Sequence, residues 1–67
     1  MFKDSMEVWI WRNTYQDVFQ SVYDSEYNSF IEAGIDEETA RFYSKHRAAF
    51  QAADMAYTNI LAYRETL

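Results

Sequence analysis

The sequence predicts an all-α protein, an antiparallel hairpin of two long helices that dimerisation completes to a four-helix bundle. The 67 residues include no proline and one glycine, Gly34, so the chain is expected to turn once. On both sides of Gly34, apolar residues recur at intervals of three and four, the spacing of one face of an α-helix. We therefore predict a single helical domain over residues 1–67, with helices at about 5–33 and 37–66 joined by a turn at 34–36.

The first helix is expected to begin after Asp4, which suits the N-cap, while Glu7 completes a variant of the capping box. Its early apolar residues share one face: Val8, Trp11, Tyr15, Val18, Phe19, Val22 and Tyr23. Three later apolar residues lie about 100° further around an ideal helix: Tyr27, Phe30 and Ile31. This shift fits either a break near Asp24-Ser25 that starts a short third helix or a continuous helix with two apolar faces. We favour the continuous helix, because breaks without glycine or proline are less common.

The turn is predicted from three consecutive residues, Gly34, Ile35 and Asp36. Glycine readily adopts the left-handed conformation just past a helix end, Ile35 can pack back onto that helix, and Asp36 suits the next N-cap. Glu37 and Glu38 then place negative charge in the first turn, where it complements the helix dipole. This acidic cluster therefore indicates a helix start and not a binding site.

The second helix is expected to face the first through a heptad seam, flanked by further apolar residues. The seam alternates steps of four and three: Thr39, Tyr43, His46, Phe50, Ala53, Tyr57, Ile60, Arg64 and Leu67. Small residues at Ala49, Ala53 and Ala56 would let the neighbouring helix approach closely.

The position of the turn also predicts the register of the hairpin, in which residues whose numbers add up to about 70 face each other. The expected neighbours include Phe30 with Tyr43, Phe19 with Phe50, Trp11 with Ile60, and Glu7 with Arg64. The last pair would explain a charged residue in the seam, because the stem of Arg64 can pack while its guanidinium reaches solvent.

Such a short chain buries only about 60% of the surface that its unfolded form exposes, so its stability needs support. With no cysteine, and with His46 as the one histidine, the sequence predicts neither a disulfide nor a structural zinc site. No metal or cofactor is expected. Dense aromatic packing is expected instead, since 19% of the residues are Phe, Trp or Tyr.

The apolar surface exceeds what two helices can bury against each other. The run from Val8 to Trp11 puts large side chains on every side of a helix. The same run could form a short strand, but no second segment offers that strand a partner. Trp9, Tyr23 and Ile31 are therefore predicted to mediate self-association, and the simplest partner is a second copy in a two-fold symmetric homodimer.

Eleven acidic and six basic residues give a net charge of −5, which argues against binding to nucleic acid. No apolar run is long enough to span a membrane, and the first residues do not resemble a signal peptide, so a soluble, cytoplasmic protein is expected. Asp17, Asp24 and Glu32 form an acidic strip on the first helix. This strip is either a solvated face or a binding site for a basic protein surface, and we take its residues as candidates for partner binding.

The sequence shows no catalytic constellation. His46 lacks an obvious nucleophile or orienting carboxylate, so no enzyme activity is expected. The sequence favours a small, acidic, non-enzymatic protein–protein interaction module. One hypothesis for its role is an inhibitor or accessory protein of a phage or mobile element that acts by binding a host protein. The alternative is a structural homo-oligomer with no separate target.

Overall fold

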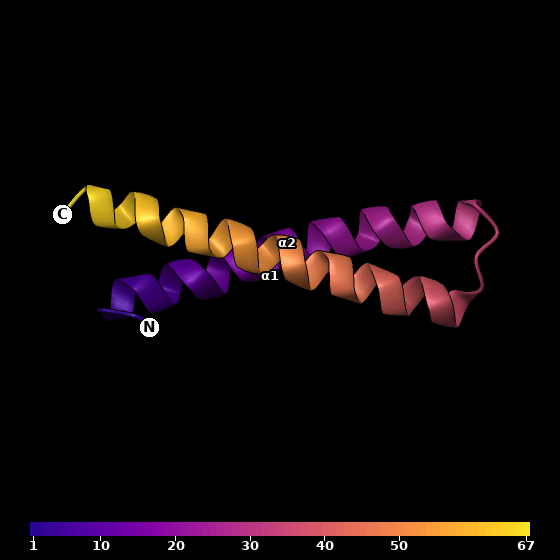
Figure 1. Ribbon diagram of the computed structural model, residues 1–67, viewed down its shortest axis with the longest axis horizontal. Helices are drawn as coiled ribbons and strands as arrows, with labels where there is room; N and C mark the ends of the chain where they lie inside the picture. Colours follow the sequence, from indigo (N-terminus) through magenta and orange to yellow (C-terminus); the bar gives the residue numbers. More distant parts are fainter.

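The computed structural model describes all residues, 1–67, as two antiparallel helices. Helix α1 spans Ser5–Glu32 and helix α2 spans Glu37–Glu65. The helices cross near their middles, and the molecule is a narrow rod of 48 × 15 × 13 Å with both termini at one end and the turn at the other (Figure 1). The predicted all-α antiparallel hairpin is confirmed, and α1 runs without a break through Asp24-Ser25.

Local hydrogen bonds set both helix starts. The side chain of Asp4 accepts a hydrogen bond from the backbone N–H of Glu7 at 2.9 Å, and that of Asp36 accepts one from Thr39 at 3.0 Å. These bonds satisfy N–H groups that have no partner within the helix. The backbone hydrogen bond from Thr39 also lowers the pKa of Asp36. Both predicted N-caps are therefore confirmed.

The turn is closed by a glycine in the predicted left-handed conformation. Gly34 has a φ of 85°. Its N–H donates to the carbonyl of Ile31, and the N–H of Ile35 donates to the carbonyl of Phe30, both at 3.0 Å. This pair of bonds is the Schellman motif, which satisfies the last carbonyls of a helix. A side chain would be strained at this φ, so the single glycine lies where the backbone needs it.

The face of α2 that meets α1 is built mostly from small residues, and we call it the inner row: Ala40, Ser44, Ala48, Ala52, Ala56 and Ile60. All six are buried, and they recur at steps of four. The predicted heptad seam is therefore wrong as the contact face, because Tyr43, Phe50 and Tyr57 are 53%, 77% and 55% exposed. Small side chains occupy the contact because they let the two helix backbones approach closely, whereas large rings would hold them apart.

Helix α1 presents two rows of half-buried side chains, again at steps of four. One row contains Ile10, Thr14, Val18, Val22, Glu26 and Phe30. The other row, the aromatic ladder, contains Trp11, Tyr15, Phe19, Tyr23 and Tyr27, whose successive rings stack with centroids 5.9–6.2 Å apart. A row with steps of four drifts by about 40° per step around an ideal helix, so helices that meet through such rows cross each other.

The observed register is close to the predicted one. The facing pairs are Phe30–Tyr43, with ring centroids 6.3 Å apart, Glu26–Arg47, Thr14–Asn59 and Glu7–Arg64. Their residue numbers add up to 71–73, against a predicted sum of about 70. The predicted packing of Phe19 against Phe50 is wrong, because the Phe50 ring lies mostly in solvent.

Candidate interaction surfaces

The predicted acidic strip consists of exposed carboxylates along α1. Both oxygens of Asp24 accept hydrogen bonds from the amide of Gln20, at 3.2 and 3.1 Å. Asp17 and Glu32 are exposed and form neither a hydrogen bond nor an ion pair. Seven residues apart, Asp17 and Asp24 share one side of α1, because seven residues make almost two full turns. These two therefore form one surface, while Glu32 lies at the far end of the helix.

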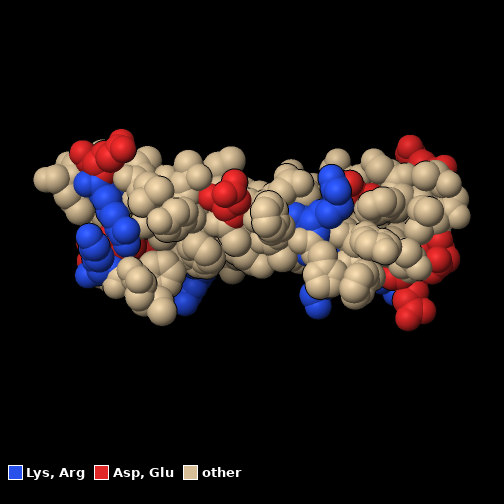
Figure 2. Space-filling view, viewed as in Figure 1, with Lys and Arg blue, Asp and Glu red and all other residues tan.

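Glu32 instead belongs to an acidic group at the turn. Asp36, Glu37 and Glu38 follow it closely in the chain, and all of them are exposed. Figure 2 shows acidic side chains gathered at the end of the rod that carries the turn. Arg41 pairs with Glu37 one turn further along α2, which offsets part of this charge.

The three residues predicted to mediate self-association do not form one patch. Trp9 is 61% exposed near the open end of the hairpin, and Ile31 is 40% exposed near the turn. Tyr23 is half-buried in the aromatic ladder, where its ring stacks on Phe19 and Tyr27. An aromatic ring that already has two stacked neighbours is less available to a partner than the sequence suggested.

Six exposed and mostly apolar side chains lie along α2, and we call them the outer stripe: Phe42, Tyr43, His46, Phe50, Tyr57 and Leu61. Phe50 lies about 160° around an ideal helix from Ala48, so the stripe and the inner row occupy opposite sides of α2 at its middle. At one end of the stripe, Phe42 meets His46 edge-on with ring centroids 4.4 Å apart. The aromatic members of the predicted heptad seam, with His46, thus face solvent, whereas its Ile60 belongs to the buried inner row.

The open end of the hairpin is held by polar contacts around Glu7, which is fully buried. Arg64 donates to both of its carboxylate oxygens at 2.9 Å, and the backbone N–H of Lys3 donates to Oε1 at 2.9 Å. The hydrogen bonds from Arg64 lower the pKa of Glu7 to about 2, against the opposing effect of burial. Tyr63 donates to Asp4 at 3.2 Å, and burial together with this carboxylate raises the pKa of Tyr63.

The predicted pairing of Glu7 with Arg64 is therefore confirmed. The contacts of Arg64 and Tyr63 in this cluster join the two ends of the chain, while the bond from Lys3 is local to the N-terminal segment. The carboxylate of Glu7 accepts hydrogen bonds on both oxygens, so a structural role is enough to explain this buried cluster.

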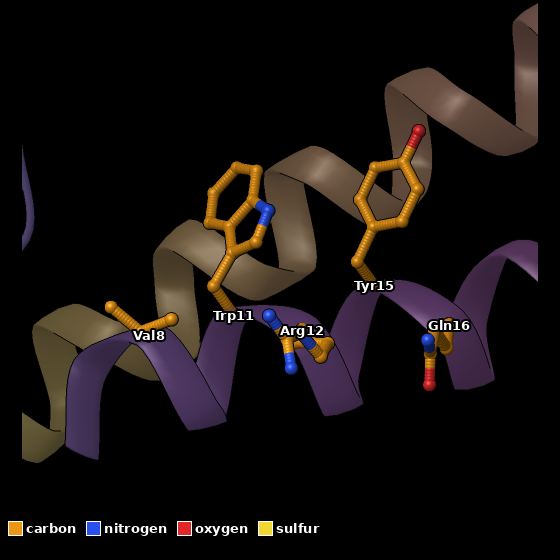
Figure 3. A pocket seen from close by; sticks show the side chains of 5 residues that line it. All are labelled: Val8, Trp11, Arg12, Tyr15 and Gln16. Atoms are coloured by element: carbon orange, nitrogen blue, oxygen red, sulfur yellow. The ribbon is translucent and has the colours of Figure 1, made fainter. Parts of the chain in front are cut away.

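A shallow groove of about 270 Å³ runs beside the ladder at Trp11 and Tyr15. Figure 3 shows these two rings rising from α1 alongside α2, while Arg12 and Gln16 lie on a different side of α1. The rings stack on each other at 6.2 Å. The groove is therefore walled by aromatic surface on one side and by polar side chains on the other.

Three further findings concern the whole chain. No group of three or more His, Cys, Asp or Glu side chains is arranged to hold a metal ion. Neither helix contains a stretch long and apolar enough to cross a membrane. Comparisons with protein-family models, with curated proteins and with solved structures found no match.

Proposed function

We propose that this chain is a small, acidic, non-enzymatic protein–protein interaction module that binds a basic surface of another protein through α1. The observation that carries the proposal is a pair of exposed carboxylates, Asp17 and Asp24, on one side of α1. The ion pairs between α1 and α2 involve other carboxylates, so neither Asp17 nor Asp24 forms one. Asp17 has no internal partner, and a surface of one sign favours association with a surface of the opposite sign.

Exposed apolar side chains on the same helix support this proposal. Trp9 is 61% exposed, and Met6 lies close to it in a second shallow groove. Tryptophan is enriched among the few residues that dominate the energy of protein interfaces. An aromatic anchor on the same helix as the two carboxylates would add apolar contact to the charge complementarity that such an interface needs. We propose the role of an inhibitor or accessory protein of a phage or mobile element that acts on a host protein.

The test is capture of a partner from a host lysate by the tagged chain. Asp17→Lys with Asp24→Lys should weaken capture of the stoichiometric partner at least tenfold, because two attractive charges become repulsive. The matched control is Glu38→Lys with Glu65→Lys, which makes the same change of charge on α2 and should retain capture. Failure to recover any stoichiometric partner, or equal loss in both double variants, would count against a binding site on α1.

A second candidate function is a structural homo-oligomer, in which dimerisation completes a four-helix bundle and no separate target exists. The outer stripe of α2 favours this candidate, because large apolar side chains that stay exposed on a monomer can be covered by another copy. Capture from the lysate distinguishes the two, because a dimeric mass in light scattering is compatible with both. Under this candidate the Asp17→Lys and Asp24→Lys changes leave the mass at two or more chains, and the function is retained.

A further inference from the structure

We infer that a second copy of this chain binds to the outer stripe, with its own α2 antiparallel to the first and the two-fold axis close to Phe50. The inference rests on the self-association proposed above and specifies the face and the orientation. Its starting observation is that Tyr43, Phe50 and Tyr57 are each more than half exposed and recur every seven residues.

The spacing of the outer stripe is that of a helix-pairing surface. Steps of three and four keep a row on one side of a helix, with a drift of only about 20° per heptad. From Tyr43 to Tyr57 the row runs for about 21 Å at 1.5 Å per residue. Two helices pack side by side along such a row, with knobs from one fitting holes in the other. The outer stripe can therefore pack along another long helix, and α2 of a second copy is such a helix.

The charges beside the stripe make α2 complementary to itself in the antiparallel orientation. Arg47 precedes Phe50 by three residues and Asp54 follows it by four, and both lie about 40–60° to the same side of Phe50 around an ideal helix. Two antiparallel copies centred near Phe50 bring each Arg47 to the other copy's Asp54. In a parallel two-fold pair, Arg47 and the other copy's Asp54 would lie about 10 Å apart along the axis and on opposite sides of the seam, so this ion pair could not form.

Within a single hairpin, both Arg47 and Asp54 have charged atoms that form no hydrogen bond. The Nε of Arg47 donates to Glu26 at 2.8 Å, but the side chain remains 56% exposed and its terminal nitrogens make no hydrogen bond. The carboxylate of Asp54 accepts no hydrogen bond, since Thr58 bonds only to the backbone carbonyl of that residue. Pairing between copies would use these groups without breaking any contact within a hairpin.

The area available is adequate for a specific contact. If each aromatic ring of the stripe loses on the order of 100 Å² on pairing, the four rings from each copy bury roughly 800 Å² in total. His46, Leu61 and the charged pairs would bring the interface toward the lower end of stable protein–protein contacts, about 1,200 Å². The arrangement leaves α1 on the outside of the dimer, where Asp17 and Asp24 stay accessible to a different protein.

Disulfide trapping between two single-cysteine variants tests the orientation. Because the chain has no natural cysteine, only the introduced cysteines can form a disulfide. Arg47→Cys and Asp54→Cys should form a disulfide-linked dimer at least tenfold faster when mixed than either does alone. In the antiparallel pair, equivalent positions 47 lie about 10 Å apart along the axis, too far for a disulfide. Asp17→Cys mixed with Asp24→Cys is the matched control on α1, with the same spacing, and should not cross-link.

Circular dichroism of each variant should show unchanged helicity, and light scattering of the unmodified chain should show two copies. Cross-linking of either variant alone at the rate of the mixture would overturn the antiparallel orientation. A dimeric mass with no cross-linking in the mixture would overturn the antiparallel pairing across the outer stripe while leaving self-association intact. A monomeric mass at hundreds of micromolar would overturn both.

Discussion

The two sides of α2 differ in the size of their side chains, and the smaller ones are buried. Ala48 and Ala52 on the inner row are fully buried, while Phe50 between them in the chain is 77% exposed. A ring removes far more apolar surface from water than a methyl group, so burial of Phe50 would be favoured if area alone decided. Close approach along the whole helix decides instead, because many small contacts are lost when one large side chain separates the backbones.

This difference has a consequence for stability. The inner row buries only one large aliphatic side chain, Ile60, so a single hairpin of 67 residues has little core of its own. If the outer stripe binds a second copy, association adds to the stability of folding and makes it depend on concentration. The two faces of α2 then serve different purposes, folding on one side and association on the other.

Substitutions that enlarge the inner row should have the largest effect. Ala48→Leu inserts three carbon atoms where the side chain is fully buried, and should destabilise the hairpin by about 3 kcal/mol through overpacking. Ala62→Leu, the same enlargement at an exposed position of α2, should change stability by less than about 0.5 kcal/mol. Urea denaturation followed by circular dichroism measures both, and equal effects would contradict the assignment of the inner row.

The two long-range ion pairs should also differ in importance. Glu7 is fully buried and accepts hydrogen bonds from Arg64 on both oxygens, whereas Glu26 and Arg47 form a pair near solvent. Glu7→Gln should therefore lower the urea midpoint clearly, because the half-buried guanidinium of Arg64 loses its matching charge. Glu26→Gln should lower it little, as expected for an exposed pair. A larger decrease in the urea midpoint for Glu26→Gln than for Glu7→Gln would show that the open end of the hairpin is not held through Glu7.

The same carboxylate should make stability depend on pH. The pKa of Glu7 is about 2 in the folded chain, below its ordinary value of 4.5, so unfolding takes up a proton between these values. Its contribution is complete above about pH 4.5 and is lost as pH falls toward 2. Asp36, whose pKa is also lowered, contributes in the same direction. Urea midpoints measured between pH 7 and pH 2.5 should fall less steeply for Glu7→Gln than for the unmodified chain.

The smallest expected effect is a gain in stability from Ser44→Ala. Ser44 interrupts the alanines of the inner row, and its buried Oγ has no hydrogen-bond partner. Its removal should stabilise the hairpin by about 1 kcal/mol, from relief of desolvation and from the higher helix propensity of alanine. Ser29→Ala, at an exposed position of α1, reports the propensity alone. A smaller gain at Ser44 than at Ser29 would indicate that the hydroxyl is satisfied in solution.

Helix ends were predictable from the sequence because they depend on neighbouring residues. Asp4, Gly34 and Asp36 each form a hydrogen bond with a residue three positions away in the chain, and the structure confirms all three. The register followed from the position of Gly34, so the pairing of Glu7 with Arg64 was predictable too.

The contact face of α2 was not predictable by the same reasoning, because its sequence carries two periodic rows. Steps of three and four select the aromatic row through Phe50, and steps of four select the small row through Ala48. The choice between them depends on how closely two backbones can approach, a property of the pair of helices. Ala56 was expected to permit close approach and is buried in the inner row, so the small residues in the sequence indicated part of the contact face. The acidic residues Asp17, Asp24 and Glu32 were predictable as exposed, but their role depends on a partner.

The mass and helicity of the Phe50→Ser variant test most directly whether the two faces of α2 have separate purposes. We predict that light scattering gives the unmodified chain twice the 8.0 kDa of one copy, and the variant the mass of one copy with its helical circular dichroism retained. Loss of helicity in the variant would mean that the outer stripe is part of the fold, and an unchanged dimeric mass would mean that copies associate through another surface.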